Sequence, residues 1–234
     1  MSDANSFEQW PVIVTGGGGA LGLAVCEALL EGGAEVHVPA HGDSDAARLA
    51  PWAERGVRVT AGVDLTDETS VGDFYDGVGA APWASIHLAG GFVWGPLVGA
   101  ELADLDRMIA MNLRTTWLCC REAARRMGDD GGRIVNVAAK PALVPTADLV
   151  TYAATKAAVA ALTQGLAEEL AGRRIWVNAV VPSVMDTAAN RESMPDADPE
   201  AWPKVEEVAR TIVFLASPAN AVTRGALVPV YGRS

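Results

Sequence analysis

The chain has 234 residues, half of them hydrophobic and a fifth charged, with a formal net charge of -11. This length fits one large domain or two small ones with a substantial core, and the composition is ordinary for a soluble globular protein. The negative charge argues against nucleic acid or an anionic membrane as the main partner, although it does not fix the sign of a local pocket.

The cysteines and the N-terminal sequence bear on the compartment. Cys26, Cys119 and Cys120 are odd in number and lie in helix-like contexts, which predicts reduced thiols and neither a disulfide framework nor a metal site. The first ten residues lack a basic segment followed by an apolar one, and no apolar run approaches about 18 residues. We therefore expect a cytoplasmic protein.

Strand and helix patterns alternate along the chain. The predicted strands are Pro11–Thr15, Glu35–Val38, Val57–Ala61, Ala84–Ala89, Arg133–Ala138, Ile175–Val181 and Ala226–Val230. The predicted helices are Ala20–Glu31, Asp45–Arg55, Asp67–Val78, Glu101–Met127, Ala147–Leu170 and Val205–Ala216. This alternation predicts an α/β fold, a single domain over residues 1–234 with one doubly wound parallel sheet and helices on both faces. Residues 182–203 show no clear pattern, and their length predicts a lid or substrate loop near 183–203.

A glycine-rich turn, residues 15–22, follows the first predicted strand and opens a helix. This is the context that a phosphate-binding turn requires, because glycines let the backbone approach a pyrophosphate and the helix start offers N–H groups. We interpret the turn as a dinucleotide site; a purely structural turn is the alternative. Asp64, after the third strand, could meet an adenine amino group or equally cap the next helix.

The predicted helix from Ala147 places Tyr152 four residues before Lys156. On a helix this spacing puts both side chains on one face, about 6 Å apart along the axis. A phenol with an ordinary pKa of about 10 is a poor acid or base at neutral pH, and a fixed ammonium nearby lowers that pKa. The pair therefore predicts a tuned proton donor or acceptor; an exposed surface pair is the alternative.

These motifs together resemble the short-chain dehydrogenase/reductase family: the turn after the first strand, Asn112 in the helix after the fourth, and the Tyr-x-x-x-Lys pattern. The resemblance covers essentially the whole chain. It implies a single Rossmann-type domain, a nicotinamide cofactor, and hydride transfer to or from a small organic substrate. It also implies that Tyr152 is the general acid in reduction, that Lys156 binds the nicotinamide ribose, and that Asn112 holds a water linking the lysine to solvent.

The same resemblance implies where the cofactor binds. The implied residues are Thr15, Gly16, Gly18, Gly19, Leu21, Gly22, His41, Asp64, Leu65, Ala89, Gly90, Gly91, Tyr152, Lys156, Pro182, Val184 and Thr187. An NAD site normally has an acidic residue at the position of Ala40, and none is there. His41 could instead face a 2′-phosphate or lie exposed in a loop. This favours NADP over NAD, with Asp43 as the residue that would restore a preference for NAD.

One departure from the family concerns the substrate. The family usually carries a serine thirteen residues before the tyrosine, and here that residue is Ala139. Its loss removes a hydrogen bond to developing charge, a contact that can contribute a few kcal/mol in the transition state. The Ala139-Lys140 pair and the Ala89-Gly90-Gly91 run resemble the dihydropteridine reductase branch. That branch reduces a conjugated C=N system, where an oxyanion-binding hydroxyl is less necessary, although Asn112 belongs to the ordinary pattern.

Residues flanking the expected crevice are candidates for substrate contact. They are Phe92, Trp94, Ala139, Lys140, Met185, Asn190, Arg191, Met194 and Trp202. The aromatic residues could stack on a flat heterocycle or pack the lid, and Asn190 and Arg191 could bind a polar or anionic substrate or cap a lid helix. Trp117 and Trp176 are expected in the core or at a subunit contact. His37 and His87 are expected to be buried and neutral, and we predict no metal site.

The resulting prediction is an NAD(P)H-dependent oxidoreductase that reduces a C=O or conjugated C=N group of a small molecule. The alternative is a family member with little or no reductase activity, acting as a cofactor-binding protein or in a non-redox or cyclisation step. A homodimer or homotetramer is expected through the helices 101–127 and 147–170, which are rich in small residues.

Overall fold

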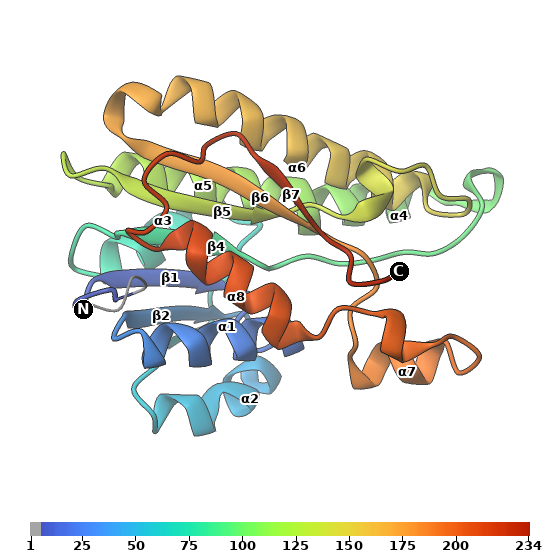
Figure 1. Cartoon of the computed structure of the whole chain (residues 1–234), viewed down its shortest axis with the longest axis horizontal. Coiled ribbons are helices and arrows are strands. Elements are labelled where there is room, and N and C mark those ends of the chain that lie inside the picture. Colours follow the sequence, from blue (N-terminus) through green and yellow to red (C-terminus); the bar gives the residue numbers. More distant parts are fainter. Residues whose placement is uncertain (1–5) are drawn as a thin grey trace.

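The apolar runs of the sequence form seven parallel strands of one sheet (Figure 1). The strands are β1 (Pro11–Thr15), β2 (Glu35–Ala40), β3 (Arg58–Ala61), β4 (Ala84–His87), β5 (Gly132–Val137), β6 (Ile175–Pro182) and β7 (Leu227–Val230). Their order is β3-β2-β1-β4-β5-β6-β7, so the chain reverses direction across the sheet between β1 and β4. The structure, a computed structural model, describes residues 6–234; residues 1–5 of the predicted domain lie outside the described part.

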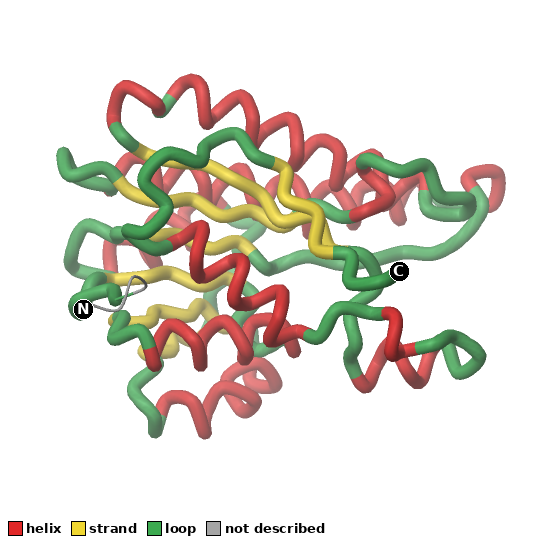
Figure 2. The backbone as a smooth tube through the Cα atoms, in the orientation of Figure 1, coloured by secondary structure: helices red, strands yellow, loops and turns green. Residues whose placement is uncertain are grey.

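Helices cover both faces of this sheet, as the tube in Figure 2 also shows. The α-helices are α1 (Ala20–Glu31), α2 (Asp43–Ala53), α3 (Glu68–Gly77), α4 (Leu102–Met108), α5 (Thr115–Arg126), α6 (Val150–Glu169), α7 (Ala188–Ser193) and α8 (Val205–Ala216). Five short helical turns are η1 (Leu97–Gly99), η2 (Ile109–Arg114), η3 (Lys140–Ala142), η4 (Ala171–Arg173) and η5 (Pro199–Ala201). The predicted α/β doubly wound fold is therefore confirmed.

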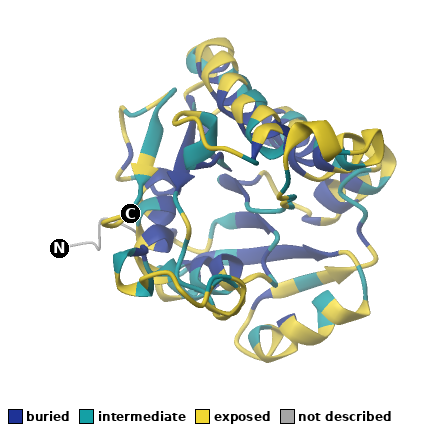
Figure 3. Cartoon of the chain, turned by 90° about the vertical axis from the view of Figure 1, so that its right-hand side faces the viewer, coloured by how far each residue is buried: buried dark blue, intermediate teal, exposed yellow. Residues whose placement is uncertain are grey.

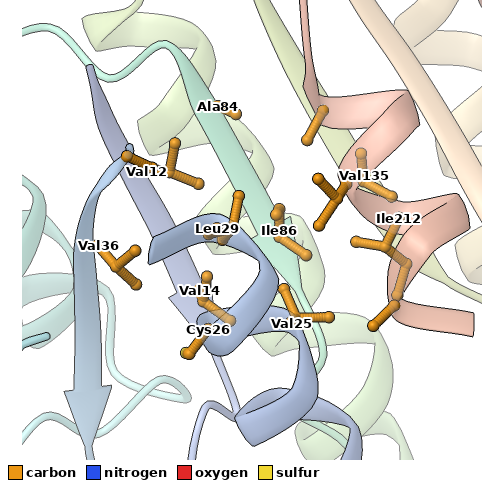
Figure 4. Packing of buried hydrophobic residues seen from close by; sticks show 14 of the residues in the cluster. Val12, Val14, Val25, Cys26, Leu29, Val36, Ala84, Ile86, Val135 and Ile212 are labelled. Atoms are coloured by element: carbon orange, nitrogen blue, oxygen red, sulfur yellow. The ribbon is translucent and has the colours of Figure 1, made fainter. Parts of the chain in front are cut away.

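Successive side chains of a strand point to opposite faces of the sheet, so the hydrophobic core has one part on each face. Val12 and Val14 of β1 pack with α1 and α8, where Leu29 and Ile212 meet them (Figure 4). Ile13, between those two valines, points the other way and packs with α3, α5 and α6. Because helices bury both faces, the strands carry continuous apolar runs instead of strict alternation with polar residues.

The predicted continuous helix over 101–127 is wrong. Its segment consists of α4, the π-helical turn η2 and α5. Within and after η2, the hydroxyls of Thr115 and Thr116 donate to the carbonyls of Met111 and Asn112, both at 2.7 Å. Such turns insert an extra residue into a helix and re-aim a side chain, and they are frequent at functional sites. Sequence periodicity does not reveal this insertion, because the segment is apolar on both sides of it.

The predicted lack of structure over 182–203 is also wrong. The segment contains α7 and η5, and Asp186 pairs with Lys204 through an isolated parallel β-bridge. The Asp186 carboxylate accepts from Lys204 at 2.6 Å and from both Arg191 nitrogens at 2.6 and 2.8 Å. These long-range pairs order a segment whose local sequence predicts only a loop.

The remaining bounds shift by at most three residues from those predicted. The largest shift is the start of α6, which begins at Val150 because Asp148 has a φ of 60° and so cannot continue a right-handed helix. None of the helices in residues 6–234 combines the length and apolarity needed to cross a membrane.

Candidate active site

A cavity of about 550 Å³ opens at the carboxyl ends of the strands, the edge that faces the viewer in Figure 3. It lies at the point where the strand order reverses, which is where open α/β sheets bind their ligands. Of the residues implied in cofactor binding, it brings together Gly16, Gly18, Gly19, His41, Asp64, Leu65, Ala89 and Gly90. Nine further lining residues were not among those implied, namely Gly17, Pro39, Asp45, Leu49, Val63, Thr66, Leu88, Met111 and Thr115.

The glycine-rich turn has no space for side chains at its key positions. Gly16 has a φ of 69°, and a Cβ there would lie 2.7 Å from the backbone nitrogen of Ala89. A Cβ on Gly22 would lie 2.2 Å from the carbonyl oxygen of Gly16, so α1 can approach the turn only with glycine at this position. The hydroxyl of Thr15 accepts from the Ala89 backbone at 3.3 Å and ties β1 to the end of β4. The turn therefore exposes backbone N–H groups at the start of α1, as phosphate binding requires.

Charged residues gather at the β2 and β3 end of the cavity. Asp64 accepts from the backbone and hydroxyl of Thr66 at 2.8 and 2.7 Å, and these hydrogen bonds lower the pKa of its carboxyl. The cap of α3 is Asp67 instead, which accepts from Ser70. His41 is exposed at this end of the cavity.

Two aspartates follow β2, and only one of them reaches the cavity. Asp43, the expected rival for NAD, is exposed in the first turn of α2 and does not line the cavity. Asp45, two residues later, does line it and pairs with Arg48. Two residues of helix turn a side chain by about 200°, so the two carboxylates point to nearly opposite sides of α2, and sequence position alone cannot tell which faces inward.

Asn112 holds the end of β4 against α6. It is fully buried in η2; its amide oxygen accepts from the Gly91 backbone at 2.8 Å, and its nitrogen donates to the Gly91 carbonyl at 3.1 Å. The same nitrogen donates to the Thr155 hydroxyl at 3.0 Å. A Cβ on Gly90 would lie 2.7 Å from the Asn112 oxygen and 3.4 Å from the Lys156 ammonium. Asn112 thus connects three segments, namely η2, the loop after β4 and α6. Its role in holding a water stays a prediction.

Tyr152 and Lys156 lie on the same face of α6, as the spacing predicts. The Lys156 ammonium lies 6.0 Å from the centre of the Tyr152 ring and donates to the Val137 carbonyl, at the end of β5, at 2.9 Å. Burial raises the pKa of Tyr152 to about 12 and lowers the pKa of Lys156 to about 8. The expected lowering of the tyrosine pKa is therefore not found here, because desolvation of the phenolate outweighs an ammonium at this distance.

The buried Lys156 ammonium makes stability depend on pH. Its pKa falls from 10.5 to about 8 on folding, so between these values the unfolded chain binds more protons and the free energy of unfolding rises with pH. We expect the stability of the wild type relative to Lys156→Met to increase by about 2 kcal/mol from about pH 7 to about pH 9.5. Urea denaturation of both proteins at the two pH values measures this. A difference that stays constant with pH would contradict a desolvated ammonium.

Aromatic side chains cover the tyrosine. Phe92 meets Tyr152 edge to face with ring centres 5.1 Å apart, and Trp94 lies 6.4 Å from Phe92. Phe92 and Trp94 are 57% and 64% exposed, so they offer open apolar surface beside the phenol. Ala139 is buried at the end of β5 and, like its neighbours, supplies no hydroxyl.

Several lid residues have partners within the protein. Asn190 donates to the Met185 carbonyl at 2.8 Å, and Arg191 pairs with Asp186. These contacts favour a role within the lid over substrate binding for both side chains. Trp202 is 7% exposed, which favours lid packing over stacking on a substrate. Thr187 caps α7 by accepting from the Asn190 backbone at 3.1 Å. Met194 is half-buried after α7, and Val184 is 38% exposed after β6.

A buried polar chain lies beneath the site. His87 bonds to Ser85 at 2.8 Å and to Asn136 at 2.8 Å, and burial lowers the pKa of its imidazole to about 4. The imidazole is therefore neutral, as predicted. His37 is also buried, and its ring lies 2.7 Å from Glu35.

The remaining predictions concern the two tryptophans and the cysteines, and their outcomes differ. Trp117 is 46% exposed on α5, which excludes the core and leaves the predicted subunit contact as a prediction, whereas Trp176 is half-buried and donates to the Ala221 carbonyl at 3.0 Å. The cysteines are free and buried, and burial raises the pKa of Cys26 and Cys119 to about 12. Such thiols are inert.

Comparison with known proteins agrees with this geometry. The sequence profile of the short chain dehydrogenase family matches residues 11–198. A galactitol 2-dehydrogenase of Rhizobium johnstonii is 34% identical, over 93% of this chain and 92% of its own, and a cyclic-di-GMP-binding biofilm dispersal mediator protein of Escherichia coli is 30% identical, over 97% and 98%. The solved structure of a gluconate 5-dehydrogenase from Burkholderia cenocepacia, in complex with NADP and tartrate, superposes with a TM-score of 0.89 at 25% identity over 98% of this chain and 96% of that one. The chain belongs to the short-chain dehydrogenase/reductase family of oxidoreductases.

Proposed function

We propose that this protein is an NADPH-dependent reductase of a flat, conjugated C=O or C=N acceptor, similar in this respect to dihydropteridine reductases. The observation that carries the proposal is the edge-to-face contact of Tyr152 with the exposed ring of Phe92, which in turn contacts Trp94. In addition, Ala139 supplies no hydroxyl where the family usually has a serine. A conjugated acceptor spreads developing charge over several atoms, so it depends less on the missing serine. A planar ring fits edge and face contacts with Phe92 and Trp94.

The residues around the cavity fit a dinucleotide. Gly16 and Gly22 let the turn pack closely against the end of β4 and against α1, and the start of α1 would present N–H groups toward a pyrophosphate. Asp64 and His41 would meet the adenosine part. Gly90 lines the cavity next to the Lys156 ammonium, so Gly90, Lys156 and Tyr152 would meet the nicotinamide part. The NADP complex of the related gluconate 5-dehydrogenase and the absence of an acidic residue at Ala40 support NADP. When bound, the nicotinamide would supply the hydride.

The protein's own residues then handle the proton. Tyr152, with a pKa raised to about 12, is protonated at neutral pH and would donate its hydroxyl proton to the reduced acceptor. Lys156 is held by the Val137 carbonyl and would stabilise the phenolate that forms. Asn112 would act indirectly, by fixing the Gly90-Gly91 backbone against α6.

A substrate panel tests the proposal. The purified protein is mixed with NADH or NADPH and with quinonoid dihydropterin, aryl ketones or simple aliphatic ketones, and loss of the reduced nicotinamide absorbance is followed. We expect NADPH oxidation with the conjugated acceptors. No oxidation with any substrate or cofactor would overturn the reductase proposal.

The alanine at residue 139 provides a sharper test. Ala139→Ser should raise turnover of aliphatic ketones by about 10-fold or more, because it restores a hydrogen bond to localised charge, and should change turnover of the pterin by less than about 3-fold. Ala142→Ser, three residues along in η3, is the control and should leave both unchanged. Equal gains on both substrate types would contradict the assignment of a conjugated acceptor.

A second candidate is a nucleotide-binding protein with little reductase activity, or one with a non-redox or cyclisation step. It is favoured by Ala139 and by the relative named as a cyclic-di-GMP-binding protein. Equilibrium dialysis separates the two candidates: tight binding of NADPH or cyclic-di-GMP without any substrate-dependent oxidation would favour the second one.

We also propose a cytoplasmic homodimer or homotetramer that pairs α5 and α6. The face they share has a groove of about 470 Å³, and Trp117 is exposed there with the Arg121 guanidinium 5.0 Å from its ring. A tryptophan with an open face is a common anchor at protein interfaces. Sedimentation equilibrium tests this, and a monomer at micromolar concentration would contradict it.

A further inference from the structure

Lys140 has a different environment from the two other lysines of the chain. The chain has only three lysines, residues 140, 156 and 204. Lys156 donates to the Val137 carbonyl and Lys204 binds Asp186. Within residues 6–234, by contrast, no hydrogen bond or ion pair is made by the Lys140 ammonium, although the side chain is half-buried. The ammonium is not among the buried unpaired atoms of the described residues, so it is reachable from solvent and free to bind an anion.

Lys140 lies at the same edge of the sheet as Ala139, the residue that replaces the usual serine. Lys140 directly follows Ala139 at the carboxyl end of β5, and its ammonium lies 5.1 Å from the centre of the Tyr231 ring. Tyr231 follows β7, two strands away from β5 in the sheet, so the side chain extends past the end of β6. Ser183, at the end of β6, donates to the Tyr231 carbonyl at 2.9 Å and holds that ring in place.

No acidic side chain of residues 6–234 forms an ion pair with Lys140, and the carboxylate that follows β6 already has partners. Asp186, which follows β6, is bound by Arg191 and Lys204, and these pairs hold the pKa of its carboxyl far below the usual range. Its charge is therefore already compensated. Contact with the Tyr231 ring positions the Lys140 ammonium, but the ring supplies no counter-charge, so an incoming anion can bind without displacing a carboxylate.

We propose that the substrate carries a carboxylate, remote from the carbon that is reduced, and that Lys140 binds it. This inference rests on the proposed reductase function, and it makes Lys140 a specificity-determining residue. A flat acceptor could then lie against Phe92 and Tyr152 at its reactive end and reach Lys140, beyond the end of β6, with its carboxylate.

A matched pair of probes tests this. 4-Acetylbenzoate and 4-acetylbenzamide share one conjugated aryl ketone and differ in charge at the far end of the ring. We expect kcat/KM of the wild type to be about 10-fold or more higher for the carboxylate. Lys140→Met should abolish that preference by lowering kcat/KM for the carboxylate alone, and Lys140→Arg should keep most of it. Arg55→Met removes an exposed cation that pairs with Glu27 before β3, at the opposite edge of the sheet, and should leave the ratio unchanged.

The outcomes separate this inference from the proposed function. Reduction of both probes with equal efficiency would overturn the role of Lys140 and leave the reductase function standing. If neither probe is reduced, binding decides: dissociation constants of both probes for the NADP-saturated wild type and Lys140→Met are measured by tryptophan fluorescence. A carboxylate preference that Lys140→Met removes supports the inference even then. Equal affinities, or no binding of either probe, overturn it.

Discussion

Tyr152→Phe is expected to lower kcat by about 100- to 10,000-fold, the range that a positioned general acid contributes. The phenol is the proton donor in the proposed reaction, and the substitution removes one oxygen while it keeps the ring that packs against Phe92. Cofactor affinity should change by less than about 3-fold, since kcat reports the proton transfer and the dissociation constant reports the cavity. Stopped-flow measurement of a single turnover, with NADPH binding followed separately, gives both quantities.

Tyr75→Phe is the matched control for this experiment. It removes a hydroxyl that is buried against Ser85 at 2.8 Å on the α3 face, away from the cavity. We expect it to lower stability by about 1 kcal/mol, the usual effect of losing one buried hydrogen bond, and to leave kcat unchanged. Retention of wild-type kcat by Tyr152→Phe would remove the tyrosine from the proton transfer and would favour the nucleotide-binding candidate.

Gly22→Ala has the second largest expected effect. Its new Cβ would lie 2.2 Å from the Gly16 carbonyl oxygen and 2.6 Å from the Gly17 Cα, and both are backbone atoms that cannot rotate away. The start of α1 must therefore move away from the turn. Overpacking of this kind costs about 1–3 kcal/mol, and if this cost falls on the shape that holds the pyrophosphate, NADPH affinity should fall by about 5- to 150-fold.

A glycine with open surroundings provides the comparison. Gly72 lies inside α3, and nothing lies within 4 Å of a Cβ built on it. Gly72→Ala should therefore stabilise the protein by about 0.5–1 kcal/mol through helix propensity and leave NADPH affinity unchanged. Isothermal titration calorimetry with NADPH measures the affinities. Equal affinity of Gly22→Ala and the wild type would place the pyrophosphate somewhere other than this turn.

The predictions about substrate choice concern residues at which the chain departs from its family. Tyr152 and Gly22 belong to the motifs by which the chain resembles its family, whereas Ala139 and Lys140 are departures. A variant at the first pair tests whether the protein is a reductase at all. A variant at the second pair tests which acceptor it takes, so the two sets of experiments can fail independently.

The sequence by itself determined the order and kind of the strands and the main positions of the site. Apolar runs that alternate with amphipathic segments predict a doubly wound parallel sheet. The observed strand bounds differ from the predicted ones by at most two residues. The glycine turn and the Tyr152–Lys156 spacing could be predicted because each is a short local pattern, although the glycines are required partly by the close approach of Ala89.

Only the tertiary structure decided the features that depend on distant segments. The η2 turn around Asn112, the order of the lid through Asp186, and the inward position of Asp45 each depend on partners that local periodicity does not encode. The raised pKa of Tyr152 belongs here as well. The sequence shows an ammonium four residues away, but burial, which arises only when strands, helices and loops pack together, has the larger effect on the phenol.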